Sequence, residues 1–409
     1  MRRPGRNARA ARSAVPERHD VSRFRRCAWL LLALFLGAPA LAKPYLPTDD
    51  GAVLERLPEK TDPSLRDVKR LRATLDRNPG DLALAARLAR RAIEAGRETG
   101  DPRFFGQAQA ALGPWWNAPN PPAQALLLRA TLKQSTHDFT DALADLDRLI
   151  AANPRDGQAL LTRATVLTVQ GRYVEARADC ARIARLAVPL VTIACDAAPA
   201  SVSGEAASAY RALTGALAAP AADAGLAEWA HTLAGEIAQR RGDAAAAEAH
   251  FRTALALDPR DPYLLGAFAD FLLDRSRPRD VVPLLKDYTR NDNLLLRLAL
   301  AEARLPEMHS SFDAHCSDLE GRYDAARRRG DTLHRREEAR YALEIAGNSE
   351  RALALARENW KVQRESADLR ILVSAAKAVG DTAALREAGD WVRAHRLEDA
   401  AITSLLQTR

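Results

Sequence analysis

The residues best suited to carry chemistry are three that lie close together in the chain, His309, His315 and Cys316. His309 and Cys316 are seven residues apart and would share one face of a helix, whereas the adjacent His315 and Cys316 would point in different directions. No carboxylate pair accompanies them, and the Cys-x-x-Cys and His-Glu-x-x-His spacings that are typical of zinc sites are absent from the sequence. We therefore expect no bound metal and no other cofactor.

Motifs that would indicate an enzyme are also missing. The chain has no Gly-x-Ser-x-Gly nucleophile elbow, no Walker-type phosphate loop and no Gly-x-Gly-x-x-Gly after a strand. Asp138, Asp141, Asp145 and Asp147 alternate with apolar residues at helical spacing, which is typical of a solvated helix face and not of a catalytic pair. The sequence is interpreted as that of a non-enzymatic protein.

The elements that would position any site come from an internal repeat. Residues 123–156 and 228–261 are both 34 residues long and close on Asn-Pro-Arg-Asp and Asp-Pro-Arg-Asp, and residues 157–188 repeat the scheme between them. A short turn divides each unit into two helices, with His137-Asp138-Phe139 in the first unit and a glycine-containing turn in the other two. Pro154 and Pro259 end the second helix, because the residue before a proline avoids helical geometry. Small residues recur where paired helices would cross: Ala130, Ala164 and Gly235 in the first helix, and Ala142, Ala176 and Ala247 in the second.

This pattern resembles the tetratricopeptide repeat. The resemblance implies an all-α fold, a right-handed superhelical solenoid of antiparallel helix pairs, in which stacking buries the apolar face that one pair leaves exposed. An irregular helical bundle is the alternative, and the regular proline and glycine punctuation disfavours it. We expect an extended segment and capping helix in residues 43–81, repeats in 82–291 with an enlarged first unit, an irregular helix pair in 292–332, and further repeats in 333–409.

Two cysteines fall on neighbouring helices of this array. Cys180 belongs to the second helix of one unit and Cys195 to the first helix of the next, joined by a short connection. We predict a Cys180–Cys195 disulfide, with two small buried side chains as the alternative. Cys316 has no partner and is expected to be either a buried or a reactive free thiol.

The N-terminus has the features of a secretion signal. Residues 1–42 contain nine arginines against two acidic residues. Within this segment the arginines precede an apolar run, which is followed by the small-x-small sequence Ala40-Leu41-Ala42. We predict cleavage between Ala42 and Lys43 and a periplasmic or secreted protein without a transmembrane span; an uncleaved anchor is the alternative. The remaining chain has 51 basic and 51 acidic residues, so it lacks the positive charge expected of a nucleic-acid-binding protein.

In the family that the repeats resemble, first helices line a concave groove that holds a peptide or partner helix. The resemblance places the following residues in that groove: Gln124, Leu127, Thr131, Gln158, Leu161, Thr165, Trp229, Thr232, Glu236, Tyr263, Asp270, His334, Glu337, Tyr341 and Arg370. The lysine and asparagine cluster that binds a C-terminal carboxylate in some family members is absent, so that specificity does not carry over.

Two adjacent tryptophans in the enlarged first unit are a second candidate surface. Trp115 and Trp116 could fill a gap that an insertion creates in the stack, or could anchor a partner. Together these features predict a protein–protein interaction scaffold in the bacterial cell envelope. A binding module for a glycan or lipid is the alternative, and a pocket of convergent rings and polar groups would favour it.

Overall fold

The computed structural model describes residues 63–219 and 223–407, which belong to one compact unit, Thr61–Arg409. The predicted leader and its cleavage point at Ala42 and Lys43 lie outside these residues. In the described part of the chain the secondary structure is helical and contains no strand. No helix among these residues is both long and apolar enough to cross a membrane.

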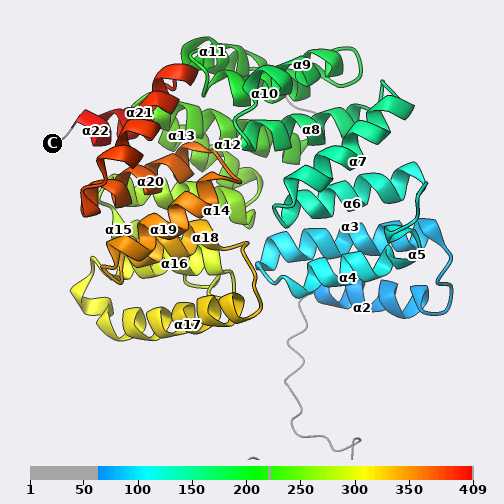
Figure 1. Ribbon diagram of the computed structural model, residues 1–409, viewed down its shortest axis with the longest axis horizontal. Coiled ribbons are helices and arrows are strands. Elements are labelled where there is room, and N and C mark those ends of the chain that lie inside the picture. Colours follow the sequence, from blue (N-terminus) through cyan, green and yellow to red (C-terminus); the bar gives the residue numbers. More distant parts are fainter. Residues whose placement is uncertain (1–62, 220–222, 408–409) are drawn as a thin grey trace, which may run out of the picture. The chain divides into compact units, whose positions relative to one another are not determined.

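The helices alternate as first and second members of hairpins stacked along the chain (Figure 1), which confirms the predicted all-α array of antiparallel pairs. A lone helix, α2 (Pro63–Leu75), precedes the pairs, and α22 (Ala400–Gln407) follows them. The pairs are α3 (Leu82–Thr99) with α4 (Arg103–Ala111), α6 (Ala123–Ser135) with α7 (Phe139–Ala152), α8 (Gly157–Val169) with α9 (Tyr173–Ile183), α10 (Pro189–Ala200) with α11 (Ala206–Leu217), α12 (Ala224–Arg240) with α13 (Ala244–Leu257), α14 (Pro262–Asp274) with α15 (Pro278–Leu285), α16 (Asp292–Glu302) with α17 (His309–Arg328), α18 (Arg335–Glu344) with α19 (Ser349–Trp360), and α20 (Ser366–Val379) with α21 (Thr382–His395).

Two short elements interrupt this scheme. The four-residue α5 (Gly113–Trp116) follows α4 in the enlarged first unit, and the 3₁₀ helix η1 (Pro306–Met308) separates α16 from the long α17. Both lie where the sequence departs from the regular 34-residue repeat.

The small residues of the repeat lie at the helix crossings, as predicted. Ala142, Ala176 and Ala247 are each completely buried on the second helices. On a first helix, a Cβ added to Gly235 would lie 2.9 Å from the ring of Phe251 on the second helix of the same pair. Since a side chain larger than hydrogen would separate the two helices there, this close approach explains the small residue.

Most hairpins turn through one residue with positive φ between their two helices. The residues are Gly100, His137, Gly171, Gly204, Gly242, Ser276, Gly347 and Gly380. The second helices α7 and α13 end two residues before Pro154 and Pro259, as the sequence predicted.

A buried ion pair repeats with the 34-residue period. Arg129 on α6 makes two hydrogen bonds to Asp145 on α7, and Arg163 on α8 makes the same two bonds to Asp179 on α9. Asp145 and Asp179 are only 3% and 2% exposed. The prediction that Asp145 belongs to a solvated helix face is therefore wrong: its carboxylate lies between the helices and is neutralised by arginine.

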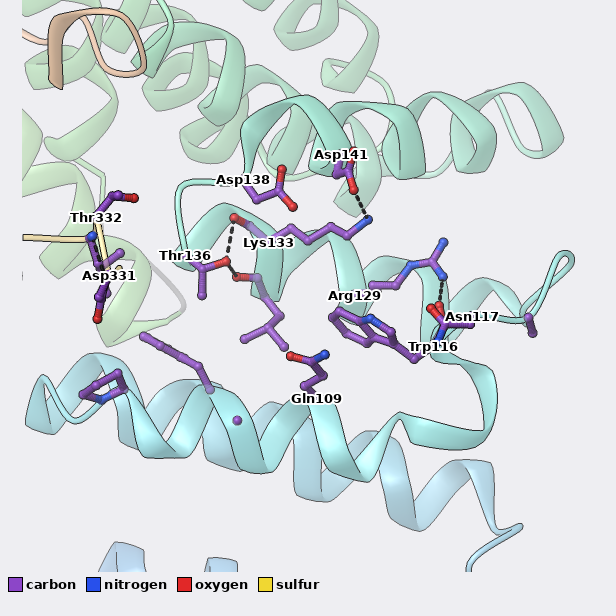
Figure 2. A pocket seen from close by; sticks show the side chains of 16 residues that line it. Gln109, Trp116, Asn117, Arg129, Lys133, Thr136, Asp138, Asp141, Asp331 and Thr332 are labelled. Carbon is purple, nitrogen blue, oxygen red and sulfur yellow. Dashed lines mark hydrogen bonds and ion pairs between the residues drawn. The ribbon is translucent and has the colours of Figure 1, made fainter. Parts of the chain in front are cut away.

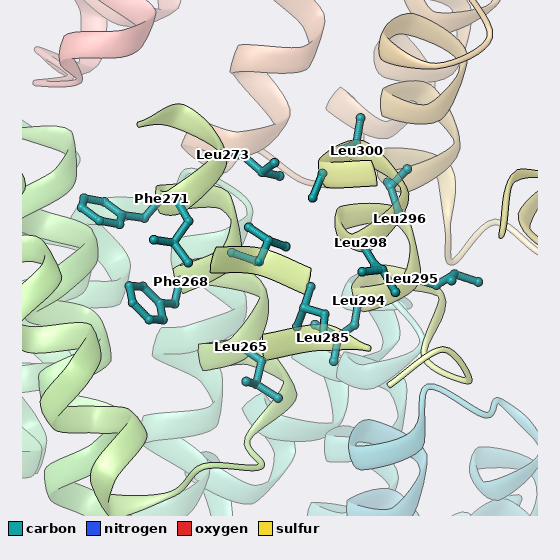
Figure 3. Packing of buried hydrophobic residues seen from close by; sticks show 14 of the residues in the cluster. Leu265, Phe268, Phe271, Leu273, Leu285, Leu294, Leu295, Leu296, Leu298 and Leu300 are labelled. Atoms are coloured by element: carbon teal, nitrogen blue, oxygen red, sulfur yellow. The ribbon is translucent and has the colours of Figure 1, made fainter. Parts of the chain in front are cut away.

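The largest apolar cluster packs helices α12–α18 together, and Figure 3 shows its central part. Phe251, Phe268 and Phe271 contribute rings whose centroids lie between 5.7 and 6.1 Å apart. Leucines of α14, α15 and α16 complete this core, which therefore extends over several consecutive pairs, as expected for stacked repeats.

The array winds back on itself, so pairs that are far apart in sequence touch. The turn after α6 contacts the segment between α19 and α20 through His137 and Gln363, whose ring and amide nitrogens lie 3.4 Å apart. One turn further, the backbone N–H of Arg364 donates a 2.8 Å hydrogen bond to the carbonyl of Val169. Near the other end of the array, Gly100 lies directly against Asn291. The C-terminal pairs thus pack along the hairpin turns of the earlier pairs.

Candidate functional site

Two of the expected groove residues of the later pairs bind each other. The hydroxyl of Tyr263 on α14 donates a 2.7 Å hydrogen bond to Glu236 on α12, although the Tyr263 side chain is 61% exposed. The negative charge of Glu236 raises the pKa of Tyr263 well above its usual value, and burial raises the pKa of Glu236. These two residues are brought together as first-helix neighbours.

Asp270 and Arg370 are already used within the chain. Asp270 on α14 binds Arg297 on α16 and, across two pairs, Arg340 on α18 at 2.6 Å. Arg370 on α20 makes two 2.6 Å hydrogen bonds to Asp274 at the end of α14. Because the array winds so tightly, these side chains hold its own later pairs in place.

Three of the expected groove residues face the interior instead. Thr232 is 2% exposed and donates a hydrogen bond to Glu228 on its own helix. Tyr341 is 6% exposed, with its hydroxyl on Glu320, and Glu337 is 9% exposed. Their placement in an open partner-binding groove is therefore corrected, because all three side chains are buried, Thr232 on α12 and Glu337 and Tyr341 on α18.

The remaining groove positions have no common site. Leu127, Leu161 and Trp229 are partly buried against the apolar clusters of their own pairs. Thr131 and Thr165 donate their hydroxyls to carbonyls one turn earlier in their helices. Gln124 and Gln158 are exposed, and His334 lies 4.0 Å from Asp292.

The cysteines divide as the sequence suggested. Cys180 and Cys195 form a disulfide between α9 and α10, with Cα atoms 5.5 Å apart, which confirms the predicted pair. Cys316 is a free, half-buried thiol, and burial raises its pKa to about 11. His315 binds Glu302 at 2.8 Å, and the described residues contain no group of three or more metal ligands. The half-buried position of Cys316 and its raised pKa favour an unreactive thiol.

The second candidate surface borders a cavity of about 640 Å³ (Figure 2). Trp116 lines it together with residues of α4, the second half of α6, the start of α7, and the loop of residues 331–333 between α17 and α18. Both tryptophans pack against the apolar core of the first unit, but Trp115 does not line the cavity. The structure therefore separates the two tryptophans: Trp115 has the filling role alone, and Trp116 also contributes to a cavity.

Apolar side chains and ion pairs share the wall of this cavity. Phe105 and Leu132 contribute apolar surface, and the guanidinium of Arg129 donates to the backbone carbonyl of Trp116 while it binds Asp145. Lys133 binds both Asp145 at 3.1 Å and Asp141 at 3.4 Å. Both cations are therefore neutralised inside the protein, and Arg129 also holds the tryptophan-bearing segment against α6.

Residue Asp331 of the distant loop completes this cavity and could not be identified from the sequence. Asp331 accepts a hydrogen bond from the backbone of Leu333 and lies almost two hundred residues after α6. Only the folding back of the array brings it to the cavity. The Arg129–Asp145 pair, in contrast, had a detectable signal, since the same two residue types recur 34 positions later.

Solved structures that are similar to this chain match it only at low sequence identity. A tetratricopeptide repeat protein from Parabacteroides merdae is 14% identical, with 70% of this chain and 98% of that chain covered and a TM-score of 0.36. The Cut9–Hcn1 hetero-tetramer gives 14% identity, 81% and 66% coverage and a TM-score of 0.47. A human IFIT1 dimer with m7Gppp-AAAA is 12% identical, with 81% of this chain and 85% of that chain covered and a TM-score of 0.39. At such scores the assignment depends on the helix pairs described above.

The sequence comparisons gave no match. No protein-family model matches the chain, and no curated protein does so.

Proposed function

We propose that this chain is a non-enzymatic scaffold that binds a segment of a partner protein in the cavity beside Trp116. The observation that carries the proposal is the cavity itself, whose volume of about 640 Å³ lies within the range usual for binding pockets. Tryptophan anchors protein interfaces more often than most residues, and here Trp116 belongs to the short helix α5 and its backbone carbonyl accepts a hydrogen bond from Arg129.

The wall of the cavity is suited to binding and offers little for catalysis. Its two cations are neutralised by carboxylates of the same pair, so they do not stand ready to stabilise a reacting anion. The described residues that line it include no cysteine, histidine or serine. Apolar surface next to polar groups is instead typical of a site that fixes the orientation of a bound segment.

A glycan is the second candidate ligand, because Gln109 and Asn117 also line the cavity with Trp116. Amide side chains beside an aromatic ring can bond sugar hydroxyls while the ring contacts the apolar face of a sugar. We rank this second because acidic side chains and apolar residues make up more of the wall than amides do.

We further propose that the protein works in the cell envelope after export. The arginine-rich leader supports this, and so does the Cys180–Cys195 bond, because disulfides persist in oxidising compartments and are rare in the cytosol. Mass spectrometry of the protein isolated from its native cells would test it. An N-terminus at Lys43 supports export with cleavage, and a cytosolic protein that begins upstream of the apolar run contradicts it.

Affinity capture from an envelope extract tests the binding function. The wild-type protein is compared with Trp116→Ala and with Tyr263→Ala, which removes the most exposed ring of the expected groove. A protein captured by wild type and Tyr263→Ala but lost with Trp116→Ala supports the cavity. Loss with Tyr263→Ala alone would place the working surface on the first helices, and capture of glycans without protein would favour the second candidate. Circular dichroism confirms that each variant is folded.

A further inference from the structure

The charges that line the cavity are unequally compensated. Arg129 and Lys133 are bound by Asp145 and Asp141. Asp138 also lines the cavity, and its exposed side chain forms no capping hydrogen bond at the start of α7. Among the described residues no ion pair involves it. One negative charge therefore remains uncompensated on the α7 side.

A second carboxylate lies on the opposite side of the cavity. Asp331 accepts a backbone hydrogen bond from Leu333, and its nearest cation is Arg329, whose nitrogen lies 3.8 Å away on an exposed side chain. This distance is close to the limit of an ion pair, so the pairing with Arg329 is weak. Figure 2 shows Asp331 and Asp138 on different elements around the same space. The excess negative charge thus comes from two sides.

Apolar residues line part of the cavity wall, together with these carboxylates and with polar residues such as Gln109, Asn117 and Thr332. Phe105 is held in place because its ring packs directly on Gly96 of α3, where an added Cβ would lie 2.6 Å from the ring. Leu132 is buried, and Leu333 and Trp116 are partly exposed. A bound segment would therefore move from water onto a rigid apolar surface, and it would meet carboxylates on both sides.

We propose that the occupant is a segment of a partner protein in which lysine or arginine stands next to an aliphatic or aromatic residue. The apolar side chain would contact Phe105, Leu132 and Trp116, and the cation would be bound by Asp138 or Asp331. This proposal rests on the proposed function and adds the chemical class of the partner. An acidic segment would instead bring like charges together at the cavity, which disfavours binding.

Selection from a displayed library of random twelve-residue peptides tests the chemical class of the partner directly. The purified protein is the bait, and Trp116→Ala is the counter-selection. We expect the enriched peptides to carry lysine or arginine within two positions of leucine, isoleucine, phenylalanine, tyrosine or tryptophan. The double variant Asp138→Lys/Asp331→Lys should reduce their binding at least tenfold and should favour acidic peptides.

A matched variant separates the local effect from net charge. Glu387→Gln removes one exposed carboxylate from α21, which does not line the cavity, and should leave binding within twofold. Asp138→Asn should weaken binding several-fold, and the loss should shrink at high salt.

The outcomes distinguish the two proposals. If the enriched peptides are acidic or uncharged, or if they bind the double lysine variant equally well, the proposed basic and apolar partner is overturned while the scaffold function stands. If no peptide is enriched over Trp116→Ala, the cavity is not a peptide-binding site and the proposed function fails with the inference.

Discussion

Trp391 occupies the space that a side chain at Gly171 would need. A Cβ built on Gly171, in the turn between α8 and α9, would lie 2.5 Å from the Cη2 atom of Trp391 on α21. The ring of Trp391 also stacks on His395 and lies under the guanidinium of Arg364, 4.8 Å from the ring centre. One glycine thus allows a C-terminal pair to pack on a turn more than two hundred residues earlier in the chain.

Substituting Gly171 should therefore weaken the contact between the early and late pairs. Gly171→Ala introduces both backbone strain at φ +76° and a clash with Trp391. Gly380→Ala is the matched control, since its φ is +73° and nothing lies within 4 Å of an added Cβ. We expect Gly171→Ala to lower the free energy of unfolding by about 1–3 kcal/mol more than the control does. Urea unfolding followed by tryptophan fluorescence measures this.

A second substitution tests the cause of that loss. In a Trp391→Ala background, the excess effect of Gly171→Ala over Gly380→Ala should disappear, because the clashing ring is gone. An excess that persists without the tryptophan would show that the clash is not its source.

The Cys180–Cys195 bond should stabilise the folded protein measurably. It closes a loop of 15 residues between α9 and α10, and a loop of this length contributes about 3 kcal/mol to the free energy of unfolding. We expect a reducing agent to lower the free energy of unfolding in urea by about this amount. The Cys316→Ser variant should lose the same amount on reduction, because Cys316 takes no part in the bond. Three free thiols in the oxidised, purified protein of residues 43–409 would contradict the bond.

Asp270 should stabilise the array at neutral pH through its two arginines. Burial alone would raise the pKa of Asp270, but Arg297 and Arg340 outweigh it and lower the pKa to about 2. Since an unfolded aspartate has a pKa of about 3.9, the stabilisation is complete above about pH 5 and is lost as the pH falls toward 2.

Asp270→Asn is expected to lower the free energy of unfolding at pH 7 by about 2 kcal/mol, because two arginines lose their common partner. The difference from wild type should shrink below about pH 4. Asp280→Asn, which removes a half-exposed ion pair with Arg277, should change stability by less than about 0.5 kcal/mol. If the stability difference between wild type and Asp270→Asn grew as the pH fell, the lowered pKa of Asp270 would be contradicted.

Cys316 should react slowly with alkylating agents. Burial raises the pKa of its thiol to about 11, so at pH 8 the reactive thiolate is about a hundredfold scarcer than for an ordinary cysteine. We expect iodoacetamide to label the native protein about a hundredfold more slowly than the urea-unfolded protein. Rapid labelling of the native protein would contradict this placement.

The sequence predicted the features that depend on neighbours in the chain. The period of 34 residues located the small residues at helix crossings, and it placed Cys180 and Cys195 on adjacent helices close enough to pair. These are local consequences of one hairpin stacking on the next, and the residue types at each position carry that information.

Contacts between distant pairs could not be predicted in this way. Within its own hairpin, each of Asp270 and Arg370 has the position of a groove residue. Their ion pairs with Arg340 and Asp274 depend on how far the array rotates from one helix pair to the next. Small rotations accumulate over many hairpins, and no residue type reports the sum. For the same reason the sequence indicated Trp116 as a candidate but could not show that Asp331 lies across the cavity from it.

The contact of Gly100 with Asn291 also limits how this chain could change in length. In an open solenoid a hairpin can be duplicated or deleted with little consequence beyond its two neighbours. Here, the loss of one hairpin between these residues would displace every later turn, and His137 and Gln363 would no longer meet. We expect relatives that share the Gly100–Asn291 and His137–Gln363 contacts to vary in their loops and surfaces. The number of hairpins between the contacting residues should stay constant.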